Sequence, residues 1–204
     1  MTRWLAVLLC CGALGAQDGP RLFYSKSFPG SSPEFVSIRV DKSGEAEYKE
    51  AANDENPLKF KLKDDQVAEI FATAEKLAWF KRPLESPLKV AFMGTKTFRF
   101  ENGAEKSEVK FNFSEDLDAR LLTDWFERIS ESEQLYINLE RAAKYDKLGV
   151  NKALLQLESA HDKKRLLAVE QFLPLLDRIQ KNETYLHMAR QRAAQLAEVF
   201  RAAK

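Results

Sequence analysis

The chain has 204 residues, and its 32 Lys and Arg residues nearly balance its 31 Asp and Glu residues. A near-neutral chain lacks the basic surface on which nucleic-acid binding depends, so we expect no nucleic-acid partner. Its length is enough for one or two compact domains with hydrophobic cores.

The first residues of the chain have the features of a secretory signal peptide. A short basic start at 1–3 precedes the apolar run LAVLLCCGALGA at 5–16. This run is too short to span a bilayer, which takes about 20 apolar residues, and its small-residue end is typical of a cleavage site. We therefore predict a signal peptide over 1–16, cleaved after Gly15 or, preferably, Ala16. The protein is then exported, either periplasmic or secreted, and no later apolar run is long enough for a membrane span.

Both cysteines of the chain, Cys10 and Cys11, lie within this predicted signal. Lipidation at Cys11, as in a bacterial lipoprotein, is the less favoured alternative, because that pattern has a small residue before the lipidated cysteine and Cys10 stands there. Cleavage after Ala16 leaves no cysteine, which excludes disulfides, thiolate zinc sites and a cysteine nucleophile.

Residues 17–113 are predicted to form an antiparallel sheet of five to six strands with one covering helix, an α+β arrangement. Apolar and polar residues alternate at 36–40, 45–49 and 58–62, with a turn at 41–44, and a period of two indicates strands with one buried face. Near Asp64 the period becomes helical, and the stripe from Val67 to Leu77 predicts the covering helix. Two aromatic strands then meet at Asn102-Gly103, a pair of residues typical of tight hairpin turns.

Residues 114–204 are predicted to be helical throughout. Apolar residues recur at three- and four-residue steps from Leu121 to Ala143, which predicts one long helix over 115–148. Three shorter helices follow and complete a C-terminal helical bundle. Because long apolar stripes also suit self-association, a homo-oligomer stays open.

The segment SFPGSSPEFVSIRVDKSGEAEYKE resembles the start of an uncharacterised family of secreted bacterial domains, a domain of unknown function. Gly30, Pro33, Phe35, Gly44 and Tyr48 match its spacing. Ser32 stands where the family has its second cysteine, and the first has no counterpart. The resemblance covers about 24–113 and implies a small α+β domain with no assigned activity, and the missing cysteines argue against a shared redox or metal role.

The sequence carries no motif for catalysis, for a cofactor or for a metal. His161 and His187 are the two histidines, and they fall on different predicted helices without a second ligand at metal-binding spacing. There is no Gly-x-Ser-x-Gly elbow and no glycine-rich phosphate loop. We therefore predict no catalytic, cofactor-binding or metal-binding residues.

A row of lysines is the first candidate for partner contacts. Lys59, Lys61 and Lys63 alternate with apolar residues, so they share the outer face of the predicted strand, and Arg39, Arg99 and Lys110 extend the patch. Such a patch suits an acidic polymer or protein. The pattern equally suits a solvated sheet face, with Glu45, Glu47 and Glu108 neutralising part of it, or an edge strand that lysine protects from self-pairing.

The connector after the first predicted helix is the second candidate. It carries Trp79, Phe92 and Met93 near two prolines, and aromatic and Met side chains are enriched at partner-binding surfaces. The alternative is a satellite cluster buried under the loop.

These observations favour an exported, non-catalytic binding or assembly module, whose partner is another envelope or secreted protein or an acidic polymer. An enzyme or small-ligand receptor is the alternative, with a site that forms only in three dimensions.

Overall fold

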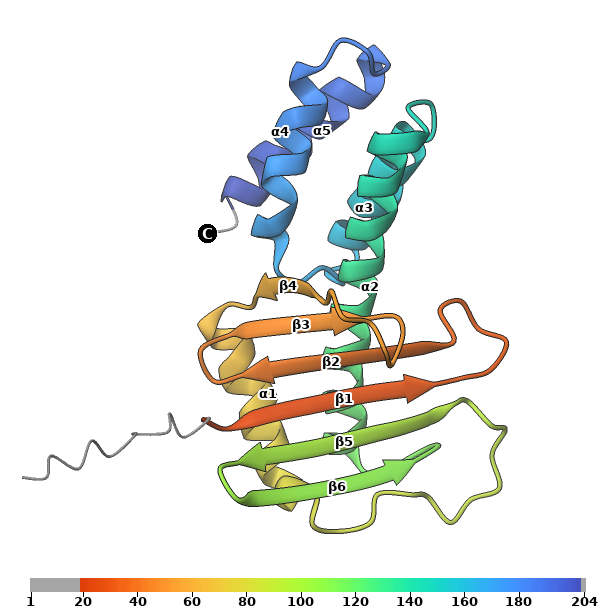
Figure 1. The fold of residues 1–204 in the computed structure, drawn as a ribbon, viewed down its shortest axis with the longest axis vertical. Coiled ribbons are helices and arrows are strands. Elements are labelled where there is room, and N and C mark those ends of the chain that lie inside the picture. The colour runs from red at the N-terminus through yellow and green to blue at the C-terminus, as the bar shows by residue number, and fades with distance from the viewer. Residues whose placement is uncertain (1–18, 203–204) are drawn as a thin grey trace, which may run out of the picture.

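The computed structural model describes residues 19–202 of the chain. The predicted signal peptide at 1–16, with Cys10 and Cys11, lies outside the described residues. Figure 1 shows a six-stranded sheet with helices on one face, and above it a group of helices that the longest helix joins to the sheet. The chain therefore has an α+β fold with a long helix and C-terminal helices, as the sequence predicts. Among residues 19–202, no helix has the length and apolar character needed to cross a bilayer.

The sheet is antiparallel throughout, in the order β4-β3-β2-β1-β5-β6. Its strands are β1 (Arg21–Ser27), β2 (Phe35–Asp41), β3 (Glu45–Lys49), β4 (Leu58–Lys61), β5 (Thr95–Asn102) and β6 (Glu105–Phe111). The first strand of the chain, β1, lies between β2 and β5. Side chains of β2 and of β5, which are far apart in the sequence, therefore flank those of β1.

The two glycines of the segment that carries the family resemblance lie at turns. Gly30 and Gly44 have φ angles of 85° and 86°, which glycine adopts without the penalty that a Cβ brings. A Cβ at Gly44 would also lie 2.7 Å from the carbonyl oxygen of Leu62. The turn between β2 and β3 therefore requires glycine for two reasons, its backbone angle and its close approach to the chain after β4.

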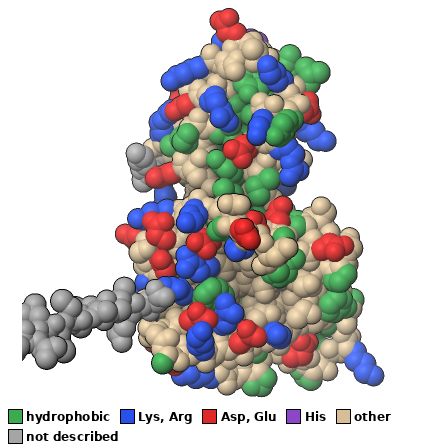
Figure 2. All heavy atoms as spheres, viewed as in Figure 1, with side chains coloured by type: hydrophobic (Ala, Val, Ile, Leu, Met, Phe, Trp, Pro, Cys, Tyr) green, Lys and Arg blue, Asp and Glu red, His purple; other side chains and the backbone are tan. Residues whose placement is uncertain are grey.

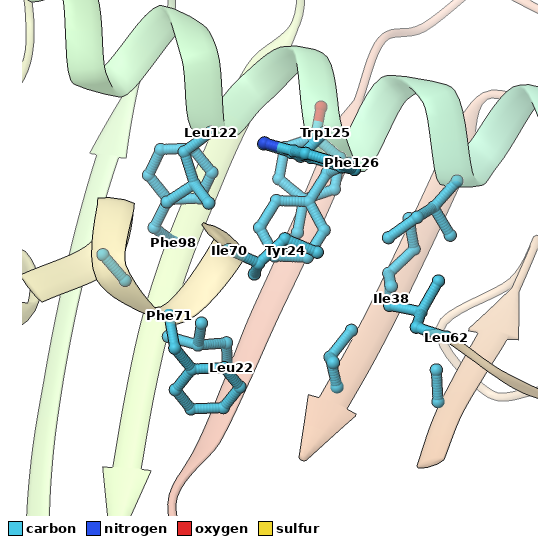
Figure 3. Packing of buried hydrophobic residues seen from close by; sticks show 14 of the residues in the cluster. Leu22, Tyr24, Ile38, Leu62, Ile70, Phe71, Phe98, Leu122, Trp125 and Phe126 are labelled. Carbon is cyan, nitrogen blue, oxygen red and sulfur yellow. The ribbon is translucent and has the colours of Figure 1, made fainter. Parts of the chain in front are cut away.

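The inner face of the sheet packs against α1 (Asp64–Lys76) and the first half of α2 (Leu117–Tyr145). Figure 3 shows side chains of both helices directed at the strands. Beyond the one covering helix expected from the sequence, α2 adds a second, because the start of its apolar stripe is buried in the core of the sheet. The stripe residues in that core are Ala119, Leu122, Trp125, Phe126 and Ile129.

The same helix α2 then enters a second core. Leu139 and Ala143 near its end pack with α3 (Val150–Asp162), α4 (Leu173–Lys181) and α5 (His187–Ala202), and the short 3₁₀ helix η2 (Val169–Phe172) precedes α4. A second 3₁₀ helix, η1 (Ala78–Phe80), follows α1. The long helix is unbroken, as expected, although it covers Leu117–Tyr145 rather than 115–148. The boundary expected between the sheet domain (17–113) and the helical region (114–204) lies just before α2. The first half of α2 packs in the core of the sheet and its end packs in the core of the helices, so the two regions share this helix.

Candidate binding site on the open face of the sheet

The face of the sheet opposite α1 and α2 is open, and it faces the viewer in Figures 1 and 2. Acidic and basic side chains are intermixed over it (Figure 2). Near its centre lies a hollow of about 420 Å³. The side chains that line it come from five strands and from the loop after β3, and they include Phe23, Ser25, Phe35, Ser37, Arg39, Glu47, Lys49, Thr97, Arg99 and Glu108.

Two arginines flank one aromatic ring at the floor of this hollow. Phe23 on β1 is directly paired with Arg39 on β2 and with Arg99 on β5. The guanidinium carbon of Arg99 lies 4.2 Å from the centroid of the Phe23 ring, a cation–π contact that orients the guanidinium plane. Nη2 of Arg39 donates a hydrogen bond of 2.9 Å to Oε1 of Glu47. The Phe23 ring thus holds the guanidinium group of Arg99, and the Glu47 carboxylate holds that of Arg39.

Each of these arginines keeps an unused hydrogen-bond donor. Nε of Arg39 and Nε of Arg99 are buried, and within residues 19–202 neither has a hydrogen-bond partner. Nε of Arg99 lies 3.4 Å from Oε1 of Glu101, but no hydrogen bond joins them. The Arg39 and Arg99 side chains as a whole are 31% and 40% exposed, so an anion in the hollow can add acceptors for the charged guanidinium groups.

Hydroxyl groups occupy the next row of the same face. Ser37, Ser25 and Thr97 are paired across β2, β1 and β5, with Lys49 and Lys110 at the two ends of the row. Hydroxyl groups can both donate and accept hydrogen bonds. The hollow therefore offers two guanidinium groups and three hydroxyls to a ligand that bears oxygen acceptors.

The predicted lysine row is only partly present. Lys59 and Lys61 lie on β4, at the edge of the sheet, and both side chains are exposed. Lys63 lies at the N-terminus of α1, where its backbone N–H donates to Oε1 of Gln66 at 3.2 Å. The chain leaves the strand before Lys63, so this residue does not continue the row.

Glutamates neutralise much of this patch, as expected for a solvated sheet face. Lys61 lies 3.8 Å from Glu45, and Lys110 lies 3.4 Å from Glu108. Arg39 is paired with Glu47 in the same way. Among the residues predicted to contact a partner, Arg99 lines the hollow, whereas Lys59, Lys61 and Lys110 belong to its surroundings.

The aromatic connector lies apart from the hollow. The Trp79 ring is partly buried and stacks on Phe100 at 4.5 Å between centroids. Phe92 and Met93 are 56% and 40% exposed, and the Phe92 ring contacts that of Phe28 at 5.9 Å. Of these three predicted contacts, Trp79 therefore packs within the fold and the other two remain on its surface.

Sequence reasoning did not identify Phe23, Ser25, Ser37 or Thr97 as site residues. The alternation of apolar and polar residues indicates which strand positions face outward. It does not indicate that β1 lies between β2 and β5, and that placement is what brings these side chains together. Arg39 and Arg99 could be named because both are charged and face outward.

The histidines do not contribute to a cluster of metal ligands. His161 on α3 is partly buried against the Phe200 ring, at 5.4 Å between centroids, and His187 is exposed at the start of α5. In the described part of the chain, no group of three or more His, Cys, Asp or Glu side chains lies close enough to hold a metal ion.

No protein-family model matches the chain, and no curated protein matches it significantly.

Proposed function

We propose that the protein is an exported, non-catalytic binding module that holds carboxylates of an acidic partner in the hollow on the open face of the sheet. Export rests on the signal peptide predicted at 1–16. The binding role rests on one observation above all: Arg39 and Arg99 flank Phe23, and each has a buried Nε–H without an acceptor.

Carboxylates fit this arrangement for geometric reasons. A guanidinium group presents its N–H donors in a planar fork that matches the two oxygens of a carboxylate. Arg39 and Arg99 are separated by two interstrand spacings, about 10 Å between their backbones, so one acidic group above Phe23 is within reach of both. The hydroxyls of Ser25 and Thr97 border the same space.

The partner is another envelope or secreted protein, or an acidic polysaccharide. Both present carboxylates along a flexible chain, and the open shape of the site allows such a chain to enter and leave. Lys59 and Lys61 at the edge of the sheet attract it at longer range, since exposed charges act mainly on encounter.

The direct test is binding of two oligomeric probes, hexaglutamate and tetragalacturonate, measured by isothermal titration calorimetry. The proposal predicts that at least one of them binds, and that the double variant Arg39→Gln with Arg99→Gln binds it about 10- to 100-fold more weakly, as expected for lost charge-assisted hydrogen bonds. The ratio of the two affinities separates a protein partner from a polysaccharide partner.

A matched control is Arg120→Gln, which removes an exposed arginine on α2, on the other side of the sheet. It should leave the affinity unchanged. If neither probe binds, or if the double variant binds as well as the wild type, the proposal is wrong.

A small-ligand receptor is the second candidate, and the size of the hollow favours it. Its volume of about 420 Å³ lies within the range of small-molecule sites. Succinate, a small dicarboxylate, is the probe for this candidate: tight binding of succinate with no gain from a longer chain would indicate a receptor rather than a module for a polymeric partner.

A further inference from the structure

A second, smaller pocket lies at one end of the sheet, between the loop that joins β1 to β2 and the middle of α2. Its volume is about 240 Å³, and its lining includes Tyr24, Lys26, Glu127, Ser130 and Gln134. This pocket lies on the helix side of the sheet, towards which the Tyr24 side chain is directed (Figure 3). The hollow described above lies on the opposite, open face.

Tyr24 has a hydroxyl group that the fold leaves unused. The residue is 1% exposed, and its ring stacks on that of Phe126 with centroids 4.9 Å apart and planes at 5°. In the described part of the chain its hydroxyl has no hydrogen-bond partner. Burial, and then the nearby charge of Glu127, raise the pKa of this phenol well above its usual value. The hydroxyl therefore stays protonated and can donate a hydrogen bond to a ligand.

A positive and a negative group lie together in this pocket. Nζ of Lys26 lies 3.3 Å from Oε1 of Glu127, and the two side chains are 31% and 42% exposed. Lys26 uses one N–H in this contact and retains donors, while Glu127 retains its second oxygen. A ligand that carries both charges can therefore bind Lys26 through its negative group and Glu127 through its positive group.

Further polar atoms complete the lining. The hydroxyl oxygen of Ser130 accepts a hydrogen bond of 3.0 Å from the side-chain amide of Gln134. The amide oxygen of Gln134 is an acceptor. Two other carboxylates in the lining already have partners: Glu34 accepts from the backbone N–H of Gly30, and Glu131 accepts from Arg165.

We propose that this pocket binds a free α-amino acid. Its carboxylate accepts hydrogen bonds from Lys26 and from the Tyr24 hydroxyl, and its ammonium group donates to Glu127 and to the amide oxygen of Gln134. A zwitterion matches the pairing of opposite charges, and a pocket of about 240 Å³ has room for a free amino acid. This site does not depend on the function proposed for the open face.

The test is titration of the purified protein with single amino acids, namely glycine and the L-forms of alanine, serine, glutamate and lysine, by isothermal titration calorimetry. Ethanolamine and acetate, which carry only one of the two charges, are the ligand controls. The proposal predicts binding of at least one amino acid, at least tenfold weaker binding of both controls, and about tenfold weaker binding to Tyr24→Phe.

Tyr24→Phe is a suitable variant because it removes only a hydroxyl that the fold does not use, so the protein should remain folded, with an unchanged melting temperature or a higher one. Glu127→Gln is the second variant and should also weaken binding, whereas Arg120→Gln at an exposed position of α2 outside the pocket should not. Failure of all five amino acids to bind, or equal affinity of Tyr24→Phe and the wild type, would overturn the proposal.

Discussion

The rings of Tyr24 and Phe126 lie face to face, with centroids 4.9 Å apart and planes at 5°. One belongs to β1, a central strand of the sheet, and the other to α2, so this contact fixes the long helix to the strand that also carries Phe23 on its opposite face. The Phe98 ring packs on both rings, at 5.8 Å and 6.0 Å between centroids. The position of the open face thus depends on a core built from β1, β5 and α2.

Removal of the Phe126 ring should therefore be costly. Phe126 is fully buried, and we expect Phe126→Ala to lower the free energy of unfolding by about 3–5 kcal/mol, as for other large buried aromatic residues. Urea unfolding followed by circular dichroism measures this. Leu121→Ala on the same helix is the control, because Leu121 is 46% exposed, and its cost should stay within about 0.5 kcal/mol. Similar costs for the two variants would contradict the packing described.

Ser132 ties the chain before η2 to the long helix. Its hydroxyl is fully buried, donates to the carbonyl oxygen of Arg128 and accepts from the backbone N–H of Leu167, both at 2.9 Å. Ser132→Ala leaves that buried N–H without an acceptor, and we expect a loss of about 1–3 kcal/mol in unfolding free energy. The matched variant Ser159→Ala removes an exposed hydroxyl on α3 and should cost much less. Equal stability of Ser132→Ala and the wild type would show that this hydrogen bond is dispensable.

Glu133 gives the stability of the fold a specific pH dependence. Its side chain is fully buried, and the amide of Gln171 donates to its Oε1 at 2.7 Å. Burial raises the pKa of this carboxyl to about 8, although the hydrogen bond from Gln171 acts in the opposite direction. In the unfolded chain the same carboxyl titrates near pH 4.5, so folding takes up a proton between these two values.

The direction in which stability changes with pH follows from that proton uptake. The stabilising effect of protonated Glu133 is fully present below about pH 4.5 and is lost as the pH rises to about 8. The total change is about 5 kcal/mol, at 1.36 kcal/mol for each pKa unit. Glu133→Gln should remove this dependence, so its unfolding free energy should rise relative to the wild type between pH 5 and pH 8.5 in urea titrations. Glu140→Gln, at an exposed site on the same helix, should keep the wild-type slope, and parallel curves for Glu133→Gln and the wild type would contradict the assignment.

The general fold could be predicted from the sequence because its signals are local. The buried stripe along α2 keeps its phase from Leu122 to Ala143, although Leu121, where the sequence analysis begins it, is exposed. The aromatic hairpin is marked by Asn102-Gly103. The second role of α2, as a covering helix of the sheet, could not be read in the same way. Its apolar stripe shows that one face is buried but does not show against which element.

The candidate site was predictable only in part, for a similar reason. Arg39 and Arg99 face outward by strand alternation, yet the ring of Phe23 between them requires knowledge of which strands are neighbours. Lys63 shows the opposite case. It continues the alternation in the sequence but lies at the N-terminus of α1, because the strand ends at Lys61 and the backbone turns into the helix.

The lysines at the sheet edge should matter less for binding than the arginines of the hollow. Lys61 is 65% exposed and only 3.8 Å from Glu45, and exposed charges of this kind contribute little to affinity. We expect Lys59→Gln with Lys61→Gln to weaken binding of the acidic probe by about threefold at most, mainly through slower association at low salt. Stopped-flow association rates at two salt concentrations measure this. A loss as large as that of the arginine double variant would locate the site at the edge of the sheet instead.

The most direct test of the binding role is an NMR titration of the arginine side chains with the acidic probe that calorimetry selects. Arg39 and Arg99 each carry a buried Nε–H without an acceptor, and their ¹⁵Nε–¹H signals report directly on a new hydrogen bond. Our account predicts that both signals move downfield together and exchange more slowly with water as the probe is added. If both remain unchanged while backbone signals at Lys59 and Lys61 shift, the hollow between the arginines is not the binding site.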